Sequence, residues 1–312
     1  MRNQVTDRAF AGVRVSAGLG VALLMLSGCS ASYNGERLYW NAQQLERQIT
    51  KDPGTATPAQ YAKAVAAFER VIKEAPSTSW AAQAQFVIGS LQAVQKKYDQ
   101  ARASYALVLQ NYNRFQQMAL NARMAVARTY EEQEDWDAVI KAYRDIADYH
   151  PFSQPGVQVP FRIGAVLEAH GKPGQAAPAY ESAVRAYQKL IAESPSPEMT
   201  IQLNGMLAAI YQKLERWDEA AKTLEEVAVI PEGVNRPLVL LTLASMYDNK
   251  LNDPERARHA YERMVTDFPT HPLAKAAKIQ LDRINKHLSV SPAPVEPAST
   301  MPETAAPSAV EP

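Results

Sequence analysis

Between about residue 36 and residue 288, apolar positions recur with the spacing of amphipathic helices, and no segment alternates convincingly as a strand does. One helical-hairpin pattern repeats five times in this region. A small residue on the first helix is followed 12 or 13 positions later by its counterpart on the second helix, and a large residue follows four positions after that. The five triplets are Gly89, Ala101 and Tyr105; Ala127, Val139 and Tyr143; Gly164, Ala176 and Tyr180; Ala208, Ala220 and Leu224; and Ala244, Ala257 and Tyr261.

This pattern predicts an all-α fold of closely packed helical hairpins. Small residues on the first helix let two antiparallel helices approach, and the large residue fills the gap to the next hairpin. Ala64 and Phe68 indicate one further second helix, and its first helix is expected over residues 36–50. We therefore expect about six hairpins in a repeat domain over residues 36–288.

Two segments of this domain differ from the repeat. The amphipathic segment from His271 to Leu288 predicts a helix that caps the last apolar face, which a stack of repeats needs. The unit over residues 157–194 is expected to be the most irregular, because Pro160 and Pro178 lie within its helical patterns.

The hairpin pattern resembles the tetratricopeptide repeat, which has a small residue and an aromatic residue on each helix and a proline, such as Pro151 or Pro269, that closes the unit. The resemblance implies a superhelical solenoid; a helical array of another family is the alternative. Residues 36–42, 75–84 and 268–277 are also similar to segments of BamD-like and TolA-binding-coordinator-like envelope lipoproteins. That likeness implies a scaffold for envelope proteins at the outer membrane.

The N-terminal residues predict an export signal. A start that contains three arginines is followed by the uncharged run from Val15 to Gly28, which is too short to span a bilayer, so residues 1–28 are interpreted as a signal peptide. Leu26-Ser27-Gly28-Cys29 resembles the lipobox of bacterial lipoproteins, which implies that Cys29 is lipidated and that 29–35 is a linker. Ser30 after the cysteine implies the periplasmic face of the outer membrane. The alternative is a free cysteine in an ordinary signal or anchor helix.

The last 24 residues, 289–312, contain six prolines, three glutamates and no lysine or arginine. Such a composition buries too little apolar surface to offset the entropy of ordering the chain, so it predicts a disordered tail. The tail is either a tether or spacer that reaches the cell wall, or a segment without a role.

Composition narrows the function classes. Of the 312 residues, 46% are apolar and 21% charged, and Lys+Arg and Asp+Glu are both 33, so the basic excess of a nucleic-acid binder is missing. A single cysteine excludes an intrachain disulfide and any multi-cysteine metal site, and the five histidines form no His-Glu-x-x-His motif. The cluster from Glu131 to Asp135 is interpreted as a solvated turn rather than as acid–base machinery. We expect no enzyme, no catalytic residue, no metal, no cofactor and no small-molecule substrate.

In the tetratricopeptide family the first helix of each hairpin lines a concave groove. The resemblance places Phe86, Met124 and Phe161 at the equivalent position of three consecutive repeats, as an apolar strip that suits a helix or an extended peptide. The alternative is that these side chains pack between repeats without a ligand. The predicted partner-binding residues are Gln83, Phe86, Asn121, Met124, Arg128, Gln158, Phe161, Gln202 and Leu241.

Three functions follow from these observations. The first is a lipid-anchored periplasmic scaffold that binds other envelope proteins or peptides through its concave surface, as in outer-membrane protein assembly. The second is a coordinator of the cell wall, a pilus or a secretion apparatus, for which the proline-rich tail matters most. The third, an enzyme with an appended repeat domain, needs a globular segment that the helical pattern over 36–288 does not leave.

Overall fold

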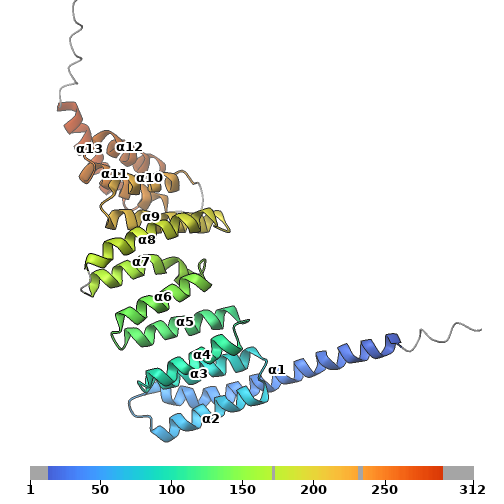
Figure 1. Cartoon of the computed structure of the whole chain (residues 1–312). Coiled ribbons are helices and arrows are strands. Elements are labelled where there is room, and N and C mark those ends of the chain that lie inside the picture. The colour runs from blue at the N-terminus through green and yellow to red at the C-terminus, as the bar shows by residue number, and fades with distance from the viewer. Residues whose placement is uncertain (1–12, 171–172, 231–234, 291–312) are drawn as a thin grey trace, which may run out of the picture. The chain divides into compact units, whose positions relative to one another are not determined.

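The computed structural model describes the backbone of residues 13–170, 173–230 and 235–290, and within these ranges it contains thirteen α-helices and no strand (Figure 1). Six consecutive helical hairpins are followed by a last helix, which confirms the expected all-α repeat fold. The helices are α1 (Val13–Lys51), α2 (Pro58–Glu74), α3 (Ser79–Val94), α4 (Tyr98–Asn111), α5 (Gln116–Glu131), α6 (Trp136–Tyr149), α7 (Gln154–Ala169), α8 (Pro173–Ala192), α9 (Pro197–Lys213), α10 (Trp217–Ala228), α11 (Arg236–Asn249), α12 (Pro254–Asp267) and α13 (Ala274–Val290).

The chain divides into two compact units, residues 1–182 and residues 183–312. The first unit is built on α1 to α7 and the start of α8, and its cores lie within and between adjacent hairpins. Its first core cluster joins α1, α2 and α3 and includes the fully buried Phe68, whose ring centroid lies 5.5 Å from that of Tyr39. The second unit runs from the end of α8 to α13 and buries Leu203, Leu240 and Met264 completely.

Close helix contact within a hairpin depends on the small residues that the sequence pattern singles out. A Cβ atom at Gly89 would lie 2.6 Å from the ring of Tyr105, and one at Gly164 would lie 2.3 Å from the ring of Tyr180. Both tyrosines are buried on the second helix of the same hairpin. Glycine is therefore required at these two positions by the thickness of the aromatic ring that lies against it.

Four of the turns inside the hairpins share one backbone conformation, which the sequence pattern does not predict. Lys96, Glu134, Glu215 and Asn252 have φ of 59°, 57°, 58° and 50°. The first three lie seven residues after the small residue of their hairpin, and Asn252 lies eight residues after it, in the hairpin whose turn has one extra residue. A left-handed residue at the end of a helix reverses the chain, so these hairpins share this geometry without using glycine.

Short side chains at the helix starts satisfy backbone N–H groups that have no partner within the helix. Thr57 and Gln60 form a reciprocal capping box at α2, with the Gln60 Oε1 accepting from the Thr57 N–H at 2.7 Å. Asp135 caps α6 and Asp253 caps α12, at 3.1 Å and 2.9 Å from the N–H three residues on. The sequence therefore marks where many of these helices begin.

Residues 29–35, which were expected to form a linker, lie within α1, which runs without interruption from Val13 to Lys51. The helix is held at this end by packing: a Cβ at Gly35 would lie 2.9 Å from Ala75 Cβ, and Leu38 and Tyr39 are buried. The structure describes the backbone alone at residues 13–30, and residues 1–12 of the predicted signal peptide lie outside the described residues. Among the described residues, no helix is both long and apolar enough to cross a bilayer.

The unit over residues 157–194, which was expected to be the most irregular, consists mainly of α7 and α8, and its residues 171–172 lie outside the described residues. Pro160 and Pro178 both lie inside helices, α7 and α8. Each proline lacks the N–H that would bond to the carbonyl four residues before it, yet neither ends its helix. The predicted cap is present as α13, and residues 291–312 of the predicted tail lie outside the described residues.

Candidate functional site

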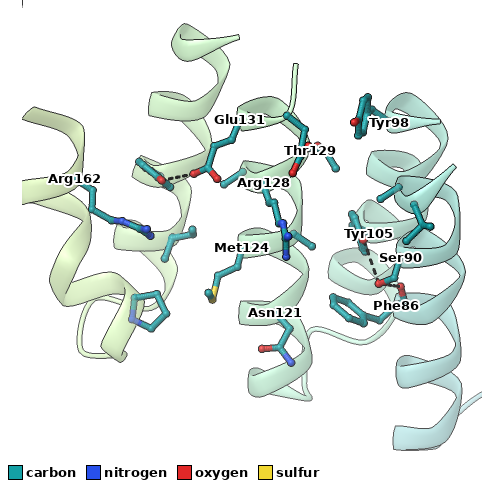
Figure 2. A pocket seen from close by; sticks show the side chains of 18 of the residues that line it. Phe86, Ser90, Tyr98, Tyr105, Asn121, Met124, Arg128, Thr129, Glu131 and Arg162 are labelled. Atoms are coloured by element: carbon teal, nitrogen blue, oxygen red, sulfur yellow. Dashed lines mark hydrogen bonds between the residues drawn. The ribbon is translucent and has the colours of Figure 1, made fainter. Parts of the chain in front are cut away.

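A cavity of about 750 Å³ opens across three consecutive hairpins of the first unit. The first helices α3, α5 and α7 supply most of its walls, while α4 and α6 contribute Tyr98, Tyr105, Tyr143 and Ile146 (Figure 2). The remaining wall residues include Phe86, Ser90 and Val94 from α3; Asn121, Met124, Arg128 and Glu131 from α5; and Pro155, Val159 and Arg162 from α7. The surface thus follows the concave face that the repeat resemblance implied, one hairpin after another.

Four of the nine predicted partner-binding residues line this cavity: Phe86, Asn121, Met124 and Arg128. Met124 is 40% exposed, so an apolar side chain is open to solvent at the centre of the surface. Phe86 is half-buried because its ring lies against Tyr105, with 5.3 Å between the centroids. Whether these residues bind a partner stays a prediction.

The other predicted residues lie elsewhere. Phe161 is half-buried against Tyr180, at 6.0 Å between ring centroids, and does not line the cavity. Gln83 and Gln158 are half-buried outside the cavity wall. Gln202 and Leu241 are half-buried on α9 and α11 of the second unit. Phe86, Met124 and Phe161 thus hold equivalent repeat positions, but only the first two face one shared space.

Two arginines of the first helices, together with Lys96, are the cationic groups of the cavity wall. Arg128 comes from α5 and Arg162 from α7, and in the view of Figure 2 Met124 lies between them. Both arginines are exposed, and the guanidinium of Arg162 lies 5.4 Å from the centroid of the Tyr143 ring. Neither forms an ion pair with a carboxylate within the described residues. Their hydrogen-bond donors therefore face the open space.

A hydrogen bond between a buried tyrosine and a glutamate joins two helices of the cavity wall. Tyr143 donates its hydroxyl hydrogen bond to Glu131 (Figure 2). Burial, together with the hydrogen bond and the negative charge of Glu131, raises the pKa of Tyr143 to about 12. Tyr180 donates in the same way to Glu168, at 2.8 Å, and its pKa is also raised, first by burial and then by that carboxylate.

These tyrosine–glutamate pairs were not foreseen, although their register was visible. Glu131 and Glu168 each lie four residues after the small residue of their hairpin, and the tyrosines lie sixteen after it. In the preceding hairpin that position is Ala93, and Tyr105 instead bonds to Ser90 at 3.3 Å. Glu131 is thus a hydrogen-bond acceptor on the cavity wall, which the interpretation as a solvated turn missed. Arg162 was not predicted as a cavity residue because its neighbour Phe161 holds the position on α7 that is equivalent to Phe86 and Met124.

No group of three or more histidine, cysteine, aspartate or glutamate residues is arranged to hold a metal ion in the part of the chain that the structure describes. The charged and amide groups of the cavity come instead from two arginines, one asparagine, one lysine and two glutamates. Such groups can form charge-assisted hydrogen bonds with a ligand.

Repeated hairpins with a shared concave cavity define a helical-repeat protein. A family model described as a tetratricopeptide repeat-like domain matches residues 12–208, and two tetratricopeptide repeat models match residues 203–238 and 238–271. The chain belongs to the tetratricopeptide repeat family. Domains of this family bind peptides or proteins and are typical of interaction scaffolds. A comparison with curated proteins gives no match.

Similar solved structures are also tetratricopeptide proteins, at low identity. TTC0263 from Thermus thermophilus is 15% identical over 66% of this chain and 100% of its own, with a TM-score of 0.38. YrrB is 17% identical over 68% and 97%, with a TM-score of 0.38. BtubC from P. vanneervenii is 15% identical over 84% and 99%, with a TM-score of 0.41. Identities this low concern the repeat fold alone, and TM-scores this low carry no argument about function.

Proposed function

We propose that this protein is a lipid-anchored scaffold at the periplasmic face of the bacterial outer membrane, and that it binds an extended segment of an envelope protein in the cavity between α3 and α7. The repeat family supports protein or peptide binding in general. The observation that carries the specific proposal is the pair Arg128 and Arg162, which lie on either side of an exposed methionine and have no carboxylate partner among the residues that the structure describes.

The chemistry of the wall defines the segment that it accepts. Phe86, Met124 and Val159 offer apolar contact, and the two guanidinium groups offer charge-assisted hydrogen bonds to a carboxylate. Asn121 adds an amide that can bond to a peptide backbone. The favoured ligand is an extended peptide that carries apolar side chains next to an aspartate, a glutamate or a terminal carboxylate. In this proposal the scaffold has no catalytic role.

Selection from a library of displayed random peptides tests the cavity directly. The intact protein is expected to enrich peptides with an acidic residue beside an apolar one. Arg128→Glu combined with Arg162→Glu should abolish that enrichment, whereas Arg144→Glu, an exposed arginine on α6 outside the cavity, should preserve it. Equal enrichment by all three proteins would overturn the assignment of the cavity.

The anchor rests on the sequence Leu26-Ser27-Gly28-Cys29 behind a basic and then apolar segment. Acyl chains on one residue hold a protein at a membrane when more than one chain is attached. Labelling of growing cells with radioactive palmitate should mark the wild-type protein and leave Cys29→Ser unlabelled. A labelled Cys29→Ser protein would refute lipidation at this residue.

Separation of envelope membranes by density tests the location. The wild-type protein is expected in the outer-membrane fraction. Recovery with the inner membrane would refute the proposed location but would leave the lipidation of Cys29 possible.

Deletion of residues 289–312 addresses the alternative coordinator role. Loss of function in cells with intact peptide binding would favour that role, because the deletion leaves every cavity residue in place.

A further inference from the structure

One face of α1 carries aromatic and basic side chains and is turned away from the rest of the first unit. Tyr33 and Trp40 are 70% and 45% exposed, which is unusual for large apolar side chains. Arg37, Arg47 and Lys51 are exposed as well. We name this surface the α1 stripe; it consists of Tyr33, Arg37, Trp40, Gln44, Arg47 and Lys51.

Helical geometry puts the six residues on a single line. They follow one another at intervals of three or four, so at 100° per residue they fall within a sector of about 80°. The residues that pack α1 against α2 and α3, such as Leu38, Ala42 and Ile49, lie on the opposite side of the helix and are buried. The stripe therefore has no packing role in the hairpin.

The stripe is positively charged. None of its three basic residues forms an ion pair with a carboxylate in the described part of the chain: Arg37 donates to Asn34 at 3.0 Å and Arg47 to Gln43 at 3.2 Å. The guanidinium of Arg47 also lies 5.8 Å from the centroid of the Trp40 ring. Glu36, an exposed acid, lies at the margin of the stripe and outside its sector.

Exposed tyrosine and tryptophan between basic residues match the chemistry of a lipid headgroup layer. Amphipathic aromatic rings concentrate at the membrane–water interface, and lysine and arginine are attracted to anionic lipids. Position 29, at which the proposed lipid would be attached, lies four residues before Tyr33 in the same unbroken helix and falls in the same sector. An anchor at this position would bring the stripe to the bilayer surface.

We propose that the α1 stripe is a second membrane contact, which lays α1 along an anionic lipid surface with Tyr33 and Trp40 at the headgroup level. The position of the stripe next to residue 29 rests on the proposed function, whereas its charge and exposure do not. The first hairpin is then fixed flat on the membrane, because no flexible linker separates position 29 from the packed part of α1.

Tryptophan quenching on vesicles tests the contact in the full-length protein purified from membranes. The vesicles contain phosphatidylethanolamine and phosphatidylglycerol, with acyl chains brominated close to the headgroups. Part of the tryptophan emission should be quenched, Trp40→Phe should remove the quenched part, and the control Trp136→Phe should keep it. Trp136 is a suitable control because it lies on α6, stacked on His170 at 3.4 Å between ring centroids. An unchanged quenched fraction in Trp40→Phe would overturn the proposal.

Charge variants give a second readout. Arg37→Glu with Arg47→Glu should weaken quenching at low salt, whereas Arg70→Glu, an exposed arginine on α2, should not. Vesicles of phosphatidylcholine alone should give less quenching than anionic ones. Equal quenching by all variants and lipids would contradict the electrostatic part of the contact.

The two proposals fail separately. Mass spectrometry of the purified chain reads acylation at Cys29, and a chain without acyl groups would refute the anchor. The stripe would still be expected to show Trp40 quenching on anionic vesicles at low salt, and its absence there would refute the stripe. Trp40 that is shielded from acrylamide in intact envelopes but not quenched by brominated lipid would show that a protein, and not lipid, covers it.

Discussion

The cavity of the first unit and the pocket of the second unit differ in how their arginines are paired. In the second unit a pocket of about 300 Å³ between α10, α11 and α12 is also lined by arginines, and two of the three, Arg256 and Arg258, form ion pairs. Arg256 lies 2.6 Å from Asp253, and Arg258 lies 3.0 Å from Glu255 and 2.8 Å from Glu262. In the first unit Arg128 and Arg162 face a larger space without such partners. Paired arginines brace a helix, whereas unpaired arginines beside apolar side chains are available to a ligand.

Buried tyrosines show a second difference. In the first unit Tyr143, on the second helix of its hairpin, bonds to Glu131 on the first helix of the same hairpin. In the second unit Tyr247, on a first helix, bonds to Glu225 on the second helix of the hairpin before it, at 2.5 Å. The same two groups therefore lock one hairpin in the first unit and join neighbouring hairpins in the second. The small-residue pattern determines the hairpin fold but not these polar contacts, so units with the same repeat fold can have different polar contacts and different surfaces.

The largest effect is expected from reversing the cavity charge. Arg128→Glu with Arg162→Glu should weaken binding of a selected acidic peptide about 100-fold, or about 2.7 kcal/mol, because two charge-assisted contacts become repulsive. Isothermal titration calorimetry measures the change. Arg256→Glu in the second unit should alter binding less than twofold, and a comparable loss there would erase the distinction between the units.

A Gly→Ala substitution should change the free energy of unfolding in opposite directions at one position of each unit. Gly164→Ala is expected to destabilise the protein by about 1–3 kcal/mol, because the new Cβ meets the buried Tyr180 ring at 2.3 Å. Gly205→Ala on α9 should stabilise it by about 0.5–1 kcal/mol, since nothing lies within 4 Å of its Cβ and alanine favours a helix. Urea unfolding followed by circular dichroism gives both values, and the same sign at both positions would contradict this packing.

Removal of the tyrosine hydroxyl inside the cavity wall should cost less. Tyr143→Phe is expected to lose about 1.5 kcal/mol at neutral pH, because a hydrogen bond to a carboxylate is lost. The pKa of Tyr143 is raised from 10.0 to about 12, so the folded chain keeps a proton that the unfolded chain releases. Its contribution to stability is therefore present below pH 10 and is lost as the pH rises to about 12. A Tyr143→Phe protein whose stability falls as steeply as the wild type over that window would refute this account.

The smallest effect is expected at the left-handed hairpin turn, which occurs in both units. Glu134→Gly and Glu215→Gly should each stabilise the protein by about 0.5 kcal/mol, because both glutamates hold a left-handed backbone that glycine adopts without strain. Thermal unfolding measures the shift. Opposite signs at the two turns would mean that the hairpin turn is not a common element of the two units, despite its shared φ angle.

The sequence was sufficient for the hairpins because the determinants are local. Small residues such as Gly89 and Gly164 and their partner tyrosines repeat at fixed distances, and side chains such as Asp135 mark helix starts. The left-handed turns were missed because lysine, glutamate and asparagine occupy them instead of glycine. Pro160 lies inside α7 and does not end it.

The site was only partly predictable for a different reason. A repeat position predicts the face of a helix, which is why Phe86, Met124 and Arg128 were placed on the concave side. It does not predict which faces share one cavity, because that depends on the packing of several helices at once. Phe161 packs against Tyr180 instead, and its neighbour Arg162 lines the cavity.

Hydrogen–deuterium exchange of the full chain with a selected acidic peptide tests the central claim most directly. If the cavity of the first unit is the binding surface, the peptide should slow exchange in α5 and α7, which carry Arg128 and Arg162, and leave α11 and α12 unchanged. Slower exchange in α11 and α12, with α5 and α7 unaffected, would contradict the account.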